Sequence, residues 1–115
     1  MPGFEPFDVV AVPFLYIERE VRKRRPAVVV SDPALAHQHA LLWVVMVTSA
    51  ANPSWPNDVA IEDLAVAGLP KPSVVRAAKI ATVEAGRCER LGRLADEAAA
   101  AVAVVLRRVL AAAAG

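Results

Sequence analysis

The stretch Val21-Arg22-Lys23-Arg24-Arg25-Pro26-Ala27-Val28-Val29-Val30-Ser31 decides how this chain folds. Four consecutive cations lead through a proline into a β-branched apolar run, and this run predicts a buried strand over residues 27–31. Cations at the start of a buried strand are carried by a rigid scaffold and therefore point in a fixed direction. Arginine forks bind phosphate through two parallel hydrogen bonds, so phosphate is the natural target of this cluster.

On either side of this stretch, short apolar runs separated by Pro, Gly, Asn and Asp predict a series of short strands. These strands are expected over residues 8–14, 41–49, 58–61, 73–76, 80–83 and 89–94. A helical turn over 62–67 should end at Gly68. The Ala-rich segment 96–112 begins with acidic residues and carries Arg107 and Arg108 late in its length, which favours one C-terminal helix. The expected fold is therefore a small, highly curved β-barrel or sheet with a helix packed on it.

Length and composition limit the classes of protein to consider. The chain has 115 residues, which predicts a single domain over 1–115, and 57% of the residues are hydrophobic, which excludes disorder and indicates a covered surface such as an oligomer interface. The net charge is only +1, so nucleic-acid binding would have to depend on local clusters of cations. The single cysteine, the lack of a signal-peptide pattern and the shortness of the apolar runs predict a cytoplasmic protein with no membrane partner.

Five side chains outside the cation cluster bear on chemistry. His37 and His39 are two residues apart in a predicted loop or strand start, but no third ligand lies nearby in the sequence, so we expect neither a metal site nor another cofactor. Trp43 lies in a buried strand pattern and is expected in the core. Trp55, between two prolines, suits either stacking on a nucleic-acid base or packing against the barrel or a partner subunit. Cys88 has no histidine partner nearby in the sequence and is expected to be structural.

Several motifs occur in an order typical of one family. They are DVVAVPF (8–14), KRRPAVVVS (23–31), VMVTS (45–49), IEDLAVAGLPKPSVVR (61–76), KIATVE (79–84) and RLGRLADE (90–97). Over roughly residues 6–110 the chain therefore resembles the PemK/MazF toxins of type II toxin–antitoxin systems. The resemblance implies an SH3-like small β-barrel with a C-terminal helix, which acts as a homodimer. It also implies metal-independent cleavage of single-stranded RNA and inhibition by a cognate antitoxin whose disordered tail wraps the dimer.

The resemblance also assigns site residues. The arginine before the proline corresponds to Arg25, the Thr-Ser pair to Thr48 and Ser49, and the arginine that is catalytic in some members to Arg76. Arg22, Lys23 and Arg24, together with Trp55, are then expected to bind RNA, because phosphate contacts position a nucleic acid without cutting it.

The general base is the part of the site that these motifs do not supply. Ala78 stands where one class of members has an aspartate that is proposed as the base. Glu18 and Glu20 are the remaining candidates, with ordinary solvated carboxylates as the alternative. Two functions therefore stay open: an endoribonuclease, or a catalytically weak or silent member that acts by binding its antitoxin, RNA or a gyrase-type target. Ala78 favours the second function, whereas Arg25 and Thr48 favour the first.

Overall fold

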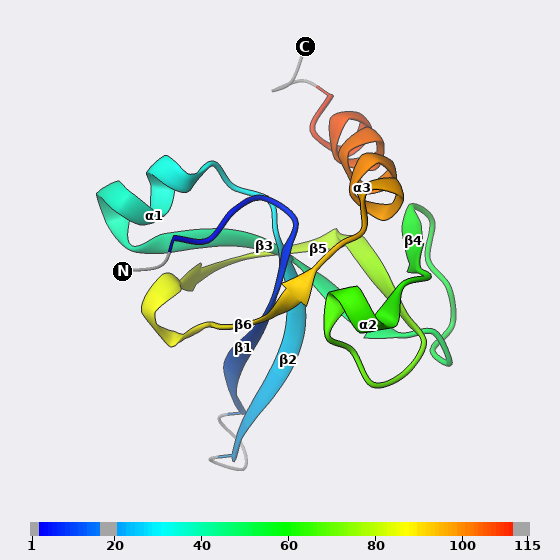
Figure 1. Ribbon diagram of the computed structural model, residues 1–115, viewed down its shortest axis with the longest axis horizontal. Helices are drawn as coiled ribbons and strands as arrows, with labels where there is room; N and C mark the ends of the chain where they lie inside the picture. Colours follow the sequence, from blue (N-terminus) through cyan, green and yellow to red (C-terminus); the bar gives the residue numbers. More distant parts are fainter. Residues whose placement is uncertain (1–2, 17–20, 112–115) are drawn as a thin grey trace.

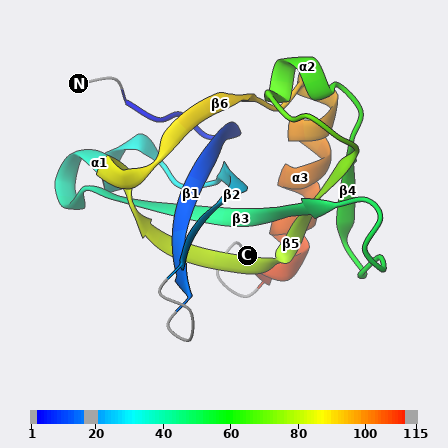
Figure 2. The ribbon, with the colours of Figure 1, turned by 90° about the horizontal axis from the view of Figure 1, so that it is seen from below.

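The computed structural model of the chain describes residues 3–16 and 21–111, and within them six strands form one curled sheet. The strands are β1 (Asp8–Tyr16), β2 (Val21–Val29), β3 (Leu41–Ser49), β4 (Asp58–Ile61), β5 (Ser73–Glu84) and β6 (Glu89–Arg93). They lie in the order β4-β5-β3-β2-β1-β6, and every neighbouring pair is antiparallel. Figure 2 shows the sheet curling into a half-barrel. The prediction of a mainly β, SH3-like small barrel with a C-terminal helix is confirmed.

The helices are α1 (Pro33–His39), α2 (Leu64–Ala67) and α3 (Asp96–Val109), and a 3-10 turn, η1 (Ala85–Arg87), precedes β6. Helix α2 ends at Gly68, which has a φ of 72°, so the predicted helical turn and its end are confirmed. The expectation of a loop or strand start at His37 and His39 was wrong, because both residues lie in α1. The sequence carries the signals that begin this helix: the Asp32 side chain accepts a hydrogen bond from the Ala34 N–H, and a proline follows Asp32.

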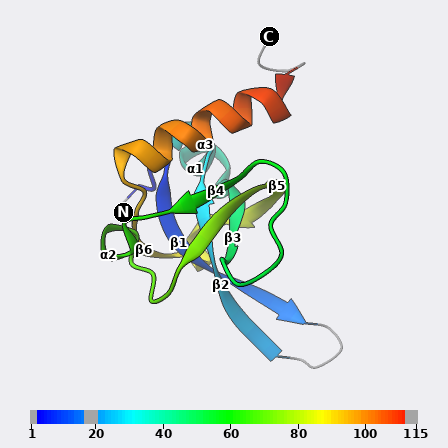
Figure 3. The same cartoon turned by 90° about the vertical axis from the view of Figure 1, so that its right-hand side faces the viewer.

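The hydrophobic core lies on both faces of the sheet. Helix α3 lies across one face, where Val102 packs with Val28, Val45 and Val75, all of them fully buried (Figure 3). On the other face a second cluster is built from β1, β2 and β3 and is covered in part by Ala36 of α1. Because residues 27–29, at the end of β2, are buried on both faces, their apolar run does not alternate with polar residues.

Pro26 marks the point where β2 leaves β3. The Val30 N–H donates to the Trp43 carbonyl, so the N–H groups of even-numbered residues in β2 face β3. Proline has no N–H, and the β2–β3 register ends one residue later, at Ala27 opposite Met46. Beyond Pro26, β2 stays paired with β1 alone, as a two-stranded ribbon that projects from the sheet at the bottom of Figure 1.

The expected start of this strand at residue 27 was therefore wrong. Strand β2 begins at Val21, and the four cations lie within the ribbon rather than ahead of the strand. The physical reason is that pairing with β1 runs along the other edge of β2, where Pro26 removes no donor.

Strand β5 is one bent strand where two had been expected. Its register with β3 jumps from Val45 opposite Ile80 to Met46 opposite Arg76, so residues 77–79 form a bulge. A bulge bends a strand and redirects the side chains beside it. Here it brings Arg76 into line with Asp58 of β4.

Trp43 is not a core residue, contrary to expectation, because 49% of it is exposed. Alternation along β3 places Trp43 on the same face as Val45, which is fully buried. Helix α3, however, packs on β4 and β5 and does not extend over the start of β3. In the described part of the chain, no helix is long and apolar enough to cross a membrane.

Candidate functional site

Three of the predicted site residues, Arg25, Thr48 and Arg76, come from three strands whose register places them on one face of the sheet. A single row across the sheet joins Ala27 of β2, Met46 of β3, Arg76 of β5 and Asp58 of β4. Residues opposite one another in an antiparallel ladder have their side chains on the same face. Arg25 lies two residues from Ala27, and Thr48 lies two residues from Met46. Alternation therefore places Arg25, Thr48 and Arg76 together on the face opposite α3.

The cation cluster is divided between the two faces of the ribbon. Arg25 is exposed and stands opposite Val12 in the ladder, whereas its neighbour Arg24 points to the other face and forms an ion pair with Glu89 of β6. Both members of that ion pair are well exposed, so the pair adds little stability. The side chains of Arg22 and Lys23, and the whole of the proposed bases Glu18 and Glu20, lie outside the described residues.

Thr48 and Ser49 are adjacent in sequence, but alternation in β3 sends them to opposite faces. The Asn52 side-chain amide donates to Thr48 Oγ1 at 2.7 Å, which leaves the hydroxyl proton of Thr48 able to point away from Asn52. Ser49 Oγ accepts from the Ala51 N–H at 3.2 Å and so stabilises the turn that follows β3. Thr48 therefore shares the face of Arg25, whereas Ser49 does not. The sequence interpretation missed Asn52, whose only signal is a polar residue four positions after Thr48.

Arg76 and Asp58 form a buried ion pair. Their side chains are only 8% and 7% exposed, and the guanidinium binds the carboxylate in bidentate fashion, with Nη2 to Oδ2 at 2.9 Å and Nε to Oδ1 at 3.2 Å. Arg76 Nη2 also donates to the Pro53 carbonyl at 2.8 Å. The hydrogen bond from Arg76 lowers the pKa of Asp58 below its ordinary value of 3.8, and this effect outweighs the opposing effect of burial. In this state both groups are occupied with each other.

The pair also orders the loop between β3 and β4. The Trp55 N–H donates to Asp58 Oδ2 at 2.8 Å, and the Asp58 N–H donates to the Trp55 carbonyl at 3.2 Å, so residues 55–58 form a closed turn. Pro56 and then Asn57, with a φ of 71°, occupy its two central positions, as a type II turn favours. The sequence identified the turn residues but not Asp58 as a site residue. An aspartate at the end of a turn is nevertheless a recognisable signal, because its carboxylate can accept a hydrogen bond from the start of the turn.

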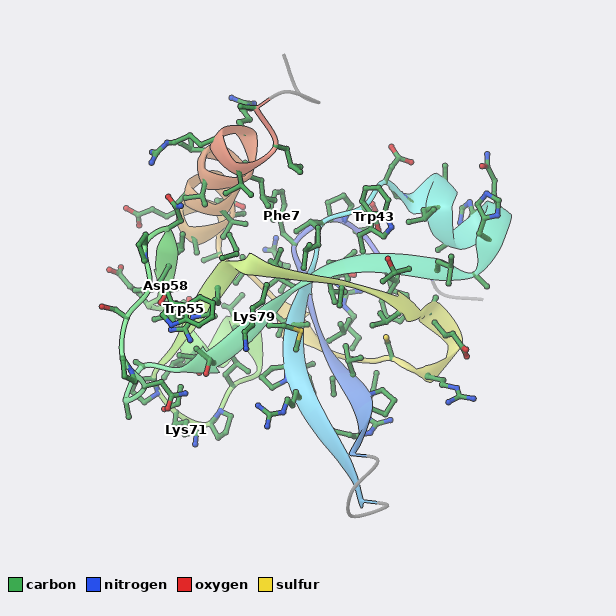
Figure 4. The ribbon with its side chains drawn as sticks, turned by 180° about the vertical axis from the view of Figure 1, so that it is seen from behind. Phe7, Trp43, Trp55, Asp58, Lys71 and Lys79 are labelled. Atoms are coloured by element: carbon green, nitrogen blue, oxygen red, sulfur yellow. The ribbon has the colours of Figure 1, made fainter. Side chains whose placement is uncertain are left out.

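Trp55 lies above this ion pair. The Cζ atom of Arg76 is 4.2 Å from the centroid of the Trp55 ring, and the Nζ atom of Lys79 is 5.3 Å from it. Figure 4 shows Trp55 beside Asp58, with Lys79 toward the middle of the sheet. Arg76 is buried while 42% of Trp55 is exposed, so the guanidinium covers the inner side of the ring and the outer side meets solvent.

The remaining candidate residues do not join this site. His37 and His39 are exposed on α1, and among the described residues no group of three or more His, Cys, Asp or Glu is placed to hold a metal ion. Burial raises the pKa of the Cys88 thiol, and this thiol donates a hydrogen bond to the Glu84 carbonyl oxygen at 3.5 Å. A half-buried thiol with a raised pKa is a poor nucleophile.

The comparisons with known proteins establish the family and agree with the fold. Residues 5–110 match the family of PemK-like, MazF-like toxins of type II toxin–antitoxin systems, and the chain belongs to that family. The fold is similar to that of MazF from Deinococcus radiodurans, with 25% identity and a TM-score of 0.74 over 96% of this chain and 99% of that one. It is also similar to a chain of the MazE–MazF complex from the same organism, with 22% identity and a TM-score of 0.76 over 96% and 98% of the two chains.

A third similar structure is an endoribonuclease in complex with its cognate antitoxin from a mycobacterial species. It is 19% identical to this chain, with a TM-score of 0.73 over 96% of each. No curated protein matches the chain.

Proposed function

We propose that this toxin is a metal-independent endoribonuclease that cleaves single-stranded RNA and so arrests growth. The observation that carries the proposal is the shared face of Arg25 and Thr48 on neighbouring strands. An exposed arginine fork is suited to phosphate, and a hydroxyl held by Asn52 is suited to orienting an oxygen beside it. Ser49 and Arg76 keep supporting roles in this proposal: Ser49 holds the turn after β3, and Arg76 holds the loop that follows it.

The reaction that these groups suit uses the RNA's own 2′-hydroxyl as the nucleophile. The 2′-oxygen attacks the adjacent phosphorus and the 5′-oxygen leaves, which gives a 2′,3′-cyclic phosphate and a 5′-hydroxyl end. Negative charge builds up on the non-bridging oxygens in the transition state, and Arg25 is placed to stabilise it. Arg22, Lys23 and Arg24 are expected to hold the strand through its phosphates, so they act mainly on affinity.

The proton acceptor is the weak part of the site. Ala78, in the bulge of β5, has no group that accepts a proton, and Asp58 already accepts hydrogen bonds from Arg76 and Trp55. A positioned acid–base pair adds roughly 10²–10⁴-fold to a rate, so an enzyme without one is slow but active. Slow cleavage is sufficient for a toxin whose targets need to be cut only once.

The test is to incubate the purified protein with a long single-stranded RNA in the presence of EDTA. We expect cleavage at discrete sites, at a rate that added Mg²⁺ leaves unchanged, because no step requires a metal. The same reaction with Arg25→Ala shows whether the activity belongs to this protein rather than to a contaminant. The absence of cleavage at every protein concentration would leave the alternative function, a toxin that acts by binding.

The partners we propose follow from the family and from the surface. A cognate antitoxin should bind and inhibit the toxin in the cytoplasm, as the complexes among the similar structures suggest. A homodimer should cover the apolar side chains exposed on β3, β5 and α3, which include Trp43, Ile80, Val104, Val109 and Leu110. Light scattering at micromolar concentration should therefore give twice the mass of the chain, and a monomeric mass would contradict this proposal.

A further inference from the structure

We propose that the Asp58–Arg76 ion pair is a positioning device that presents Trp55 as a stacking platform for one base of single-stranded RNA. This inference rests on the proposed function, and it gives Arg76 a role distinct from catalysis. The ligand class is an unpaired nucleobase with its adjoining phosphate.

The first argument is that the backbone and the ring of Trp55 are both fixed. The Asp58 carboxylate accepts hydrogen bonds from the Trp55 N–H and from Arg76, and the Pro53 carbonyl accepts another from Arg76. These contacts fix the loop on either side of the tryptophan, and the guanidinium supports its ring from below. Because 42% of Trp55 is exposed, packing within this chain does not occupy the whole ring.

The second argument concerns what surrounds the ring. Lys79 is exposed and places its amine 5.3 Å from the centroid of the Trp55 ring, so this cation is accessible to a phosphate. Lys71 belongs to the loop that the Ala50 N–H holds through the Pro72 carbonyl, and Figure 4 shows it on the same side of the molecule. An aromatic platform flanked by cations is the arrangement that single-stranded nucleic-acid binders use without regard to sequence.

The third argument is the location of the platform. The turn that carries Trp55 begins a few residues after Thr48, and Asn52, which holds the Thr48 hydroxyl, belongs to the same loop. Arg76 and Asp58 lie in the same cross-strand row as Met46, two residues from Thr48. A base stacked on Trp55 would thus lie on the face where the proposed phosphate site lies.

The experiment measures binding of a short single-stranded oligonucleotide whose 2′-oxygens are methylated, so that it binds without being cleaved. The chain has two tryptophans, and a Trp43→Phe background leaves Trp55 as the sole reporter. We expect the oligonucleotide to quench Trp55 fluorescence in a saturable way. By anisotropy of a labelled oligonucleotide, Trp55→Ala should weaken binding about 5- to 160-fold in Kd, the range for one base stacked on an aromatic ring. Trp55→Phe should restore most of the affinity.

The positioning role needs its own variant. The double variant Arg76→Met with Asp58→Leu removes both charges together and should weaken Kd by a similar factor, while kcat at saturating RNA changes much less than KM. A Kd for Trp55→Ala within twofold of wild type, or quenching that is absent, would overturn the platform even if the protein cleaves RNA. Saturable quenching in a protein that does not cleave RNA would support the platform and contradict only the nuclease function. Quenching by a cognate antitoxin peptide but not by the oligonucleotide would assign the ring to a protein partner and overturn the inference.

Discussion

Arg25→Ala is expected to reduce RNA cleavage by about 10²–10³-fold, the usual cost of removing one donor that stabilises charge in a transition state. The Arg25 side chain is exposed, although its ladder partner Val12 belongs to a core cluster, so the melting temperature should stay close to that of the wild type. The measurement is the single-turnover rate on a defined RNA, together with a thermal melt of the same preparation. In cells, the variant should no longer arrest growth.

Arg24→Ala is the matched control, because Arg24 is the adjacent cation in the same strand but points to the other face and pairs with Glu89. It should weaken RNA binding a few-fold and leave the rate at saturating RNA nearly unchanged. Arg25→Lys should recover little activity, since it keeps the charge but loses the planar fork. If Arg24→Ala and Arg25→Ala reduced the cleavage rate equally, the ribbon would contribute only general electrostatic attraction. A large drop in the melting temperature of Arg25→Ala would instead assign Arg25 a structural role.

Arg76→Ala should destabilise the fold by about 3–5 kcal/mol, because it leaves Asp58 as a buried carboxylate without its partner. For a domain near this size, 1 kcal/mol corresponds to roughly 4 °C, so the melting temperature should fall by about 12–20 °C. The Pro53 carbonyl also loses its donor, and Trp55 loses the group beneath its ring. Thermal melts at neutral pH measure the effect.

The double variant Arg76→Met with Asp58→Leu is the control, since apolar replacement of a whole buried pair is often nearly neutral. If it melts as low as Arg76→Ala, the pair itself, and not the orphaned charge, carries the stability. Acid provides a second check. The folded state lowers the pKa of Asp58 below 3.8, so its stabilisation is present above that pH and is lost as the pH falls further. As the pH falls below 3.8 the wild type should therefore lose more stability than the double variant.

Most strands were predictable because their apolar patterns and turn residues agree with each other. The runs at 41–49 and 58–61 are flanked by strong turn signals, and both strands have the predicted bounds. What could not be predicted depended on neighbours in space. The start of β2 is set by pairing with β1, and the continuity of β5 through its bulge is set by the register with β3. Trp43 is exposed because α3 covers a different part of the sheet.

In the candidate site, too, local motifs were predictable and contacts between distant residues were not. Arg25 and Thr48 were identified from short motifs, and the sheet places them on one face because both are an even number of residues from partners in the ladder. The ion pairing of Arg76 was not predictable, because its partner, Asp58, lies 18 residues earlier in the chain. The same contact joins the turn at Trp55 to β5, and neither turn propensity nor motif spacing contains that information.

The missing N–H of Pro26 has a consequence for how proteins of this shape diversify. From Pro26 outward, the ribbon shares no ladder with β3, and among its described residues it supplies only Val12, opposite Arg25, to the two core clusters, so the part beyond Val12 can change while the β2–β3 register is kept. We therefore expect this outer part of the ribbon to be exchangeable between relatives while the barrel is kept. Transplanting the outer ribbon of another toxin onto this scaffold, with Val12 kept, would test whether the proposed RNA specificity is carried by the ribbon.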